Sequence, residues 1–367
     1  MTDDIRFSSP IAIDKGLTRR SVLAAGAALT AFGLGRTGPA KAESRGVPFG
    51  AMIQSDYFRQ DAVYRQAFLD RCDMIVPGAE LKFDQIRPER DIWRLQPAET
   101  LVDFAMDNGR TSRGHTHVWW NSVPSWLEAI TDRREGERVL IEHVERVTDH
   151  FRGRLLGWDV VNEVIAHDPI QEGPLRRSKW LQLLGPRHIP LAFEATARTD
   201  PNARLVVNDY DLEFVGPRFD ARREIMLTIV RQMLDANIPV GGVGIQGHLY
   251  GDRQIDIDAL TRFHKDLDAL GVELLVTELD VINRESAPDP ASMDALAGKL
   301  VGDLMDGIFA WKRPAAVVTW GITDRYTWIP DEMPRYDGEP HRPLPLDRDY
   351  RPKAWFETLK ARLLSAS

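Results

Sequence analysis

Short apolar runs alternate eight times with longer amphipathic stretches between Val47 and the C-terminus. A short apolar run predicts a buried strand, and apolar residues at three- and four-residue spacing predict a helix. Eight parallel strands, each followed by a helix, form the (β/α)8 barrel, a single domain of roughly 250 residues or more. The predicted strands are Phe49–Gln54, Met74–Pro77, Gly114–Trp119, Trp158–Val161, Leu205–Asn208, Val243–Gln246, Leu274–Thr277 and Ala316–Trp320, and a helix at Ala354–Leu364 ends the series. An open doubly wound sheet is the alternative, but it normally shows a Gly-rich first turn, which we do not find.

The first 42 residues have the pattern of an export signal. Arg19 and Arg20 form a twin-arginine pair, an Ala/Gly-rich apolar run follows from Val22 to Leu34, and Ala40-Lys41-Ala42 is a small-x-small cleavage pattern. These features in this order predict cleavage after Ala42 and a periplasmic or secreted protein, with the barrel domain at 43–367. The apolar run is too short for a membrane span of about 20 residues, so no membrane association is expected after cleavage. The alternative is a disordered basic tail.

The formal net charge of −8, with no basic stripe, argues against nucleic acid as a partner. An acidic chain is compatible with a neutral substrate. Cys72 is the only cysteine, so no internal disulfide can form.

Two of the apolar runs lead into a glutamate. They are Gly157-Trp158-Asp159-Val160-Val161-Asn162-Glu163 and Glu273-Leu274-Leu275-Val276-Thr277-Glu278. In a barrel the C-terminal ends of the strands form the active-site face. Two carboxyls facing each other there, at roughly 5–5.5 Å, are what glycoside hydrolysis with retention requires. The alternative is that each glutamate caps a helix or forms a salt bridge.

Polar and aromatic residues also gather where the other predicted strands end, as expected for a site on this face. They include Glu80, Lys82, His115, Trp119, Asn162, Gln246, His248 and Trp320, with Trp328 in the loop after the last strand. The aromatic faces are suited to packing against sugar rings. His115-Thr116-His117 resembles a metal-binding pair, but no partner set has ligand spacing. The sequence also lacks a phosphate loop, a serine-nucleophile elbow and a dinucleotide fingerprint, so no metal or cofactor is expected.

The chain resembles glycoside hydrolase family 10, the endo-β-1,4-xylanases. The matching motifs follow in the family's order from about Phe49 to Phe356. Beside the two glutamate runs, the matching motifs are Glu80-Leu81-Lys82-Phe83-Asp84, Arg113-Gly114-His115-Thr116, Pro124-Ser125-Trp126, Asn208-Asp209-Tyr210, Gly244-Ile245-Gln246-Gly247-His248-Leu249 and Thr319-Trp320-Gly321-Ile322-Thr323-Asp324. The resemblance implies a retaining double displacement without a cofactor, with Glu163 as general acid and base and Glu278 as nucleophile. It also implies sugar-contacting or supporting roles for Lys82, His115, Trp119, Asn162, Gln246, His248, Trp320 and Trp328.

Three of the departures from the family pattern bear on contacts with the substrate. Ala79 stands where the family usually has an asparagine that contacts the sugar on the non-reducing side, and Ser122 replaces a glutamine that contacts the sugar at the cleaved bond. Trp120 replaces a histidine, and could add stacking or narrow the cleft.

The expected protein is therefore an exported, monomeric retaining endo-β-1,4-xylanase that acts on a β-1,4-linked polysaccharide or oligosaccharide of the xylan type. One alternative is a related β-glycanase with another sugar preference. The other is a non-catalytic glycan-binding protein on the same scaffold, which would not need both glutamates.

Overall fold

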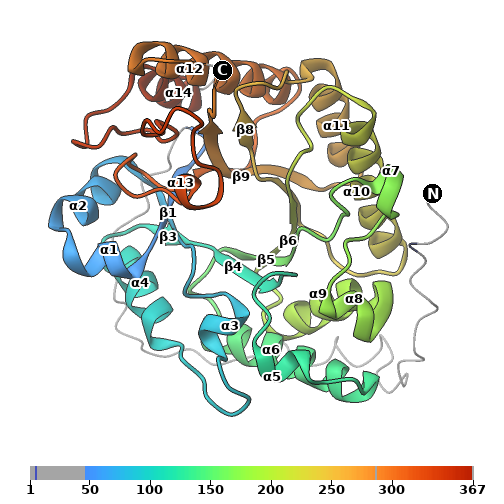
Figure 1. The fold of residues 1–367 in the computed structure, drawn as a ribbon. Coiled ribbons are helices and arrows are strands. Elements are labelled where there is room, and N and C mark those ends of the chain that lie inside the picture. The colour runs from blue at the N-terminus through green and yellow to red at the C-terminus, as the bar shows by residue number, and fades with distance from the viewer. Residues whose placement is uncertain (1–4, 6–45, 286, 366–367) are drawn as a thin grey trace, which may run out of the picture.

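Nine parallel strands form a nearly closed ring around which the helices are arranged (Figure 1). The computed structural model describes Ile5, residues 46–285 and residues 287–365. The ring has the order β3-β2-β1-β10-β9-β7-β6-β5-β4. Its strands are β1 Phe49–Ile53, β2 Met74–Pro77, β3 Thr111–Ser112, β4 Gly114–Val118, β5 Gly157–Asn162, β6 Arg204–Asp209, β7 Gly242–Ile245, β9 Glu273–Ile282 and β10 Val317–Thr319. Each predicted strand overlaps one of these, so the barrel prediction is confirmed.

The third predicted strand, Gly114–Trp119, corresponds to β4, and a short strand that was not predicted, β3, precedes it. β3 pairs with β2 on one side, β4 pairs with β5 on the other, and Arg113 alone separates them. Gly114 begins β4 at a point where a Cβ atom would collide with the Trp158 ring. The strand pairing therefore changes next to this glycine, from β2 before it to β5 after it. The apolar pattern alone does not indicate this change.

β9 is longer than predicted and carries an additional pairing. Its first part pairs with β7 as far as Val276, whereas the part beyond pairs with β8 (His248–Tyr250), where His248 lies opposite Asp280. Glu278 therefore lies inside a strand and not at its end. Gly247, with φ 78°, makes the turn between β7 and β8 in a conformation that favours glycine.

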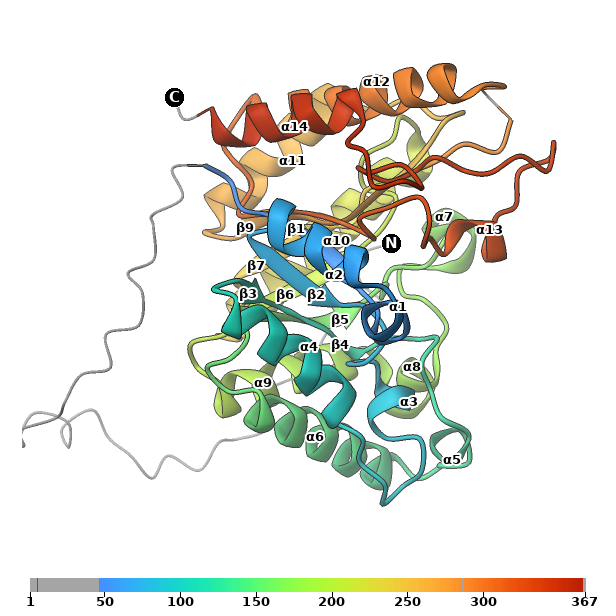
Figure 2. The same ribbon diagram turned by 90° about the vertical axis from the view of Figure 1, so that its left-hand side faces the viewer.

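The helices cover the outside of the ring, and several begin at a polar cap (Figures 1 and 2). The longer ones are α2 Ala62–Arg71, α4 Gln96–Asp107, α6 Arg133–His150, α9 His188–Thr199, α10 Pro217–Asp235, α11 Ile257–Ala269, α12 Pro290–Phe309 and α14 Ala354–Leu364. The shorter ones are α1 Ser55–Gln60, α3 Phe83–Ile86, α5 Ser125–Glu128, α7 Pro169–Glu172, α8 Lys179–Leu184 with the 3-10 turn Gly185–Arg187, and α13 Ile329–Glu332. Asp132, Asp256 and Asp289 accept the free backbone N–H groups at the starts of α6, α11 and α12, which stabilises those starts.

Two apolar clusters hold the barrel together. The larger one joins the outward faces of the strands to the helices. The smaller one consists of side chains on or beside β1, β2, β6, β9 and β10 that fill the barrel interior, as expected for this fold: Met52, Met74, Val76, Val206, Leu275, Ala316, Val318 and Trp320. Because this interior is packed, polar groups collect beyond it, at the C-terminal ends of the strands.

The predicted export signal at 1–42 lies, apart from Ile5, outside the described residues. The chain after β10 contains the single turn of α13. None of the helices in the described part of the chain is both long and apolar enough to cross a membrane.

Candidate active site

Side-chain amides connect the two predicted glutamates across the mouth of the barrel. Glu163 Oε1 accepts a hydrogen bond from Gln246 Nε2 at 3.2 Å, and the same nitrogen donates to Asn162 Oδ1 at 3.2 Å. Asn208 Nδ2 donates to Asn162 Oδ1 at 2.8 Å and to Glu278 Oε1 at 2.6 Å. The structure therefore brings Glu163, Glu278, Asn162 and Gln246 together, and Asn208 completes the layer.

Asn208 occupies this position because its neighbours leave room for it. Its Oδ1 accepts from Thr277 Oγ1 at 2.6 Å, and a Cβ atom at Gly244 on the adjacent strand would collide with that same oxygen. Asn208 ends a predicted strand but is not among the predicted site residues. Two signals in the sequence point to it: its position one strand along from Asn162, and its place in the motif Asn208-Asp209-Tyr210.

Glu278 is 4% exposed and has three polar partners. Besides Asn208, His248 Nε2 lies 3.3 Å from Oε2 and His115 Nδ1 lies 3.8 Å from Oε1. Burial alone would raise the pKa of this carboxyl, but His115, His248 and Asn208 outweigh burial and hold the pKa below its ordinary value. Glu278 is therefore ionised at neutral pH.

A second carboxylate stands behind His248. Asp280 Oδ1 lies 2.8 Å from His248 Nδ1, and Asp280 Oδ2 accepts from Trp328 Nε1 at 2.8 Å. Burial lowers the pKa of His248, but Asp280 and Glu278 reverse that effect and raise the pKa well above its ordinary value. The imidazolium therefore donates one N–H to each carboxylate. The Trp328 ring packs against the His248 ring, with centroids 5.3 Å apart.

His115 has a similar partner in Asp159. Its Nδ1 lies 3.0 Å from Asp159 Oδ2, while Arg113 binds the other oxygen of Asp159. Trp320 packs its ring edge against His115, with centroids 4.9 Å apart. Neither Asp159 nor Asp280 is among the site residues predicted from the sequence. Asp280 could have been found, because it lies two residues after Glu278 and therefore on the same face of β9.

Lys82 and Trp119 form another side of the site. Lys82 Nζ lies 4.5 Å from the centroid of the Trp119 ring. Burial lowers the pKa of Lys82, although the charges of Glu278 and Glu163 oppose this shift. Both carboxylates therefore influence the same ammonium group.

Glu80, also predicted as a site residue, binds the backbone next to Lys82. Its Oε1 accepts the backbone N–H of Ser55 at 2.6 Å, and its Oε2 accepts that of Ala79 at 3.2 Å. With both oxygens bound to backbone, Glu80 fixes the segment that carries Lys82.

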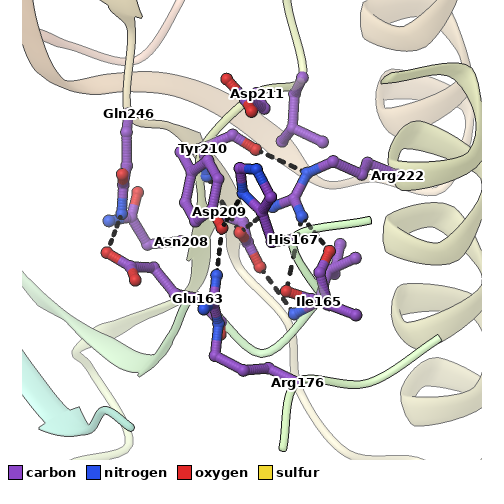
Figure 3. A network of polar contacts seen from close by, with 12 residues as sticks. Glu163, Ile165, His167, Arg176, Asn208, Asp209, Tyr210, Asp211, Arg222 and Gln246 are labelled. Carbon is purple, nitrogen blue, oxygen red and sulfur yellow. Dashed lines mark hydrogen bonds and ion pairs between the residues drawn. The ribbon is translucent and has the colours of Figure 1, made fainter. Parts of the chain in front are cut away.

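Glu163 is more open than Glu278. Its backbone is held by Asn208 and Arg176, both labelled in Figure 3. Its φ of 55° lies in the left-handed region, which a residue other than glycine seldom adopts. Its N–H donates to the Asn208 carbonyl at 2.9 Å, and its carbonyl accepts from Arg176 Nε at 3.0 Å. At the carboxyl, Trp120 Nε1 donates to Oε2 at 2.6 Å.

A buried ion pair fixes the chain that follows Glu163. Arg222 binds Asp209, both side chains are fully buried, and Asp209 Oδ2 accepts the N–H of Ile165 at 3.0 Å. Arg222 also donates to the Tyr210 carbonyl at 3.0 Å, and the Tyr210 hydroxyl accepts from Arg176 (Figure 3). The ends of β5 and β6 are therefore locked together, which explains how Glu163 retains its unusual backbone conformation.

No group of three or more His, Cys, Asp or Glu side chains is placed to hold a metal ion among residues 46–285 and 287–365 and Ile5. The polar groups of the mouth instead form pairs around two carboxyls in different environments. One carboxyl is buried and held ionised by cations, and the other is more open. A barrel with this pair of carboxyls among aromatic side chains has the features of the glycoside hydrolase class.

Comparison with known proteins agrees with this class. The model of glycosyl hydrolase family 10 matches residues 39–362, and the chain belongs to that family. A β-1,4-xylanase of Dictyoglomus thermophilum is 32% identical over 343 residues, which cover 87% of this chain and 93% of the relative. The structure of xylanase 10B from Thermotoga petrophila RKU-1 in complex with xylobiose is similar with a TM-score of 0.79 and 29% identity, covering 88% of this chain and 95% of that chain. Native xylanase 10B from Thermotoga maritima is similar with a TM-score of 0.79 and 28% identity, covering 88% and 96%.

Proposed function

We propose that this protein is a retaining endo-β-1,4-xylanase that hydrolyses internal xylosidic bonds of xylan or xylo-oligosaccharides. The observation that carries the proposal is the layer of amides between Glu163 and Glu278, which gives the two carboxyls different environments within one site. Family membership and the xylanase relatives support the substrate class. A protein that only bound glycans would not need a buried carboxylate held ionised beside a second, open carboxyl.

In the first step the Glu278 carboxylate attacks the anomeric carbon, and a covalent glycosyl–enzyme bond forms as the bond to the leaving oxygen breaks. Glu163 gives its proton to that oxygen. In the second step Glu163 takes a proton from water, the water oxygen bonds to the anomeric carbon, and Glu278 departs. Two inversions retain the configuration of the sugar.

The surrounding residues support these two roles. His248, Asn208 and His115 stabilise the negative charge of Glu278, which keeps the nucleophile ionised. Lys82, Trp119, Trp320 and Trp328 offer polar and flat aromatic surfaces to the sugar.

The test is hydrolysis of an aryl β-xylobioside, the matching aryl β-cellobioside and a mannan oligomer by wild type and Glu278→Ala. We expect xylobioside turnover in wild type, and none in the variant with its circular dichroism spectrum unchanged. Turnover of only the cellobioside or the mannan oligomer would agree with the two-step mechanism. It would point to Ala79 and Ser122 as the source of a different sugar preference. Binding without turnover of any of the three would favour the non-catalytic alternative.

We also propose that residues 1–42 form a cleavable twin-arginine signal and that residues 43–367 act as a monomer outside the cytoplasm. Its support is the order of the basic, apolar and small-residue regions. The test is expression in a bacterium with a working twin-arginine pathway. The exported chain should begin at Glu43, and replacement of Arg19 and Arg20 by lysine should retain the precursor inside the cell. An exported chain with Met1 intact would contradict the proposal. Gel filtration of the exported chain tests whether it is a monomer.

A further inference from the structure

Trp120 contacts the carboxyl of Glu163 directly, although it stands where the family pattern usually has a histidine. Its indole Nε1 donates to Glu163 Oε2 at 2.6 Å, while its side chain remains 38% exposed. We propose that Trp120 is a positioning residue for the acid/base carboxyl: its N–H orients the outward oxygen of Glu163 toward the leaving group. This inference rests on the proposed function of Glu163.

The two oxygens of Glu163 are bound from different sides. Oε1 is bound by Gln246 Nε2 at 3.2 Å and by Asn162 Nδ2 at 3.5 Å, and both amides are almost completely buried. Oε2 is bound by the exposed Trp120. Because buried amides occupy the inner side, a leaving-group oxygen reaches Glu163 on the side of Oε2, next to the indole. An indole N–H donates only, so it orients this oxygen without accepting the catalytic proton.

Arg176 holds the indole in place. Its guanidinium lies 4.9 Å from the centroid of the Trp120 ring, and its Nε donates to the Glu163 carbonyl at 3.0 Å. The edge of Trp119 packs against Trp120, with centroids 6.1 Å apart. The same arginine therefore fixes both the donor ring and the backbone of the acceptor, so the N–H is oriented before a substrate arrives.

A hydrogen bond donated to a carboxylate favours its charged form. Trp120 therefore stabilises the state that Glu163 reaches after giving up its proton. Several other charged or titratable groups surround Glu163, and a change at position 120 leaves all of them in place. They are Lys82, Arg176, Asp209 and Tyr210, with Glu278 across the layer of amides. Comparison of wild type with a variant at this position consequently isolates the N–H.

The test is Trp120→Phe, which keeps an aromatic ring beside Arg176 and removes the donor. Trp311 provides a matched control on the outer wall: its side chain is 47% exposed, its Nε1 donates to Asp268 at 3.2 Å, and Lys265 Nζ lies 5.0 Å from its ring centroid. Wild type, Trp120→Phe and Trp311→Phe are compared by kcat/KM against pH. The substrates are 2,4-dinitrophenyl β-xylobioside and an unactivated xylo-oligosaccharide.

Removal of the N–H should move the alkaline limb of the Trp120→Phe profile to higher pH by about 0.5–1 unit, because the ionised acid loses its donor. The loss of kcat/KM should be about ten-fold greater on the unactivated substrate, which needs the acid, than on the dinitrophenyl glycoside. Trp311→Phe should match wild type in both measurements.

An unmoved alkaline limb, or equal losses on the two substrates, would overturn the proposal and leave Trp120 as a packing residue. A protein that failed to hydrolyse either xyloside in its wild-type form would instead refute the proposed function. The two failures are therefore distinguishable.

Discussion

Replacement of Asp280 by asparagine tests the charge arrangement behind the proposed nucleophile. Asparagine keeps the shape of the side chain and an oxygen for Trp328 Nε1, but it removes the negative charge next to His248. The contact of 2.8 Å between His248 Nδ1 and Asp280 Oδ1 places the two charges roughly 4 Å apart, where an effective dielectric constant of about 20 gives about 4 kcal/mol. That energy equals about three pKa units, so the pKa of His248 should fall strongly and its imidazolium form should be less stable.

The weakened imidazolium form of His248 should be visible in the pH dependence of activity. The pKa of Glu278 lies below its ordinary value, so the nucleophile is ionised above that pKa and is lost as the pH falls through it. With less positive charge on His248, whose Nε2 lies 3.3 Å from Glu278 Oε2, the ionised form of Glu278 is less stable and its pKa rises. The acidic limb of kcat/KM for Asp280→Asn should therefore move to higher pH by about one unit.

The assay is kcat/KM on an aryl β-xylobioside across the pH range, together with NMR titration of the His248 ring. Asp268→Asn is a matched control, because Asp268 also binds a tryptophan N–H and a cation, Trp311 and Lys312, but on the outer wall. The control should reproduce the wild-type acidic limb. An Asp280→Asn enzyme with an unmoved acidic limb and an unchanged His248 titration would refute the reasoning.

Three further substitutions have definite expected outcomes. Glu163→Ala should lose most activity on unactivated xylosides yet keep the first step on aryl glycosides with good leaving groups, seen as a burst of released phenol; equal losses on both would contradict the acid role. Asn208→Ala should lower kcat/KM about 100-fold, because Glu278 and Asn162 both lose a hydrogen-bond donor. Full activity of this variant in steady-state assays would show that the amide layer is dispensable. Lys353→Met should lower the free energy of unfolding by about 3 kcal/mol or more in urea titrations, because Lys353 Nζ lies 2.7 Å from the fully buried Asp324; an unchanged midpoint would refute this.

The positions of the strands could be predicted from the sequence. The apolar runs at Met74–Pro77 and Leu205–Asn208 coincide with or lie within strands, because a strand packed against helices outside and side chains inside must be apolar along its length. Glu163 and Glu278 could be identified for the same reason, since each interrupts or ends such a run where the packed interior gives way to the mouth.

The tertiary structure decided how these residues are used. Gln246 and Glu163 are 83 residues apart in sequence and meet only because β5, β6 and β7 pair in a fixed register. The support of His248 by Asp280 depends on β8 joining the extension of β9, and the contact of Trp120 with Glu163 depends on a loop held by an arginine. Apolar periodicity reports which segments are buried, whereas the hydrogen bonds of the site depend on which strands are neighbours and on their register. That is why the sequence alone determined the barrel and its two glutamates, and only the packed ring determined the charge of Glu278 and the orientation of both.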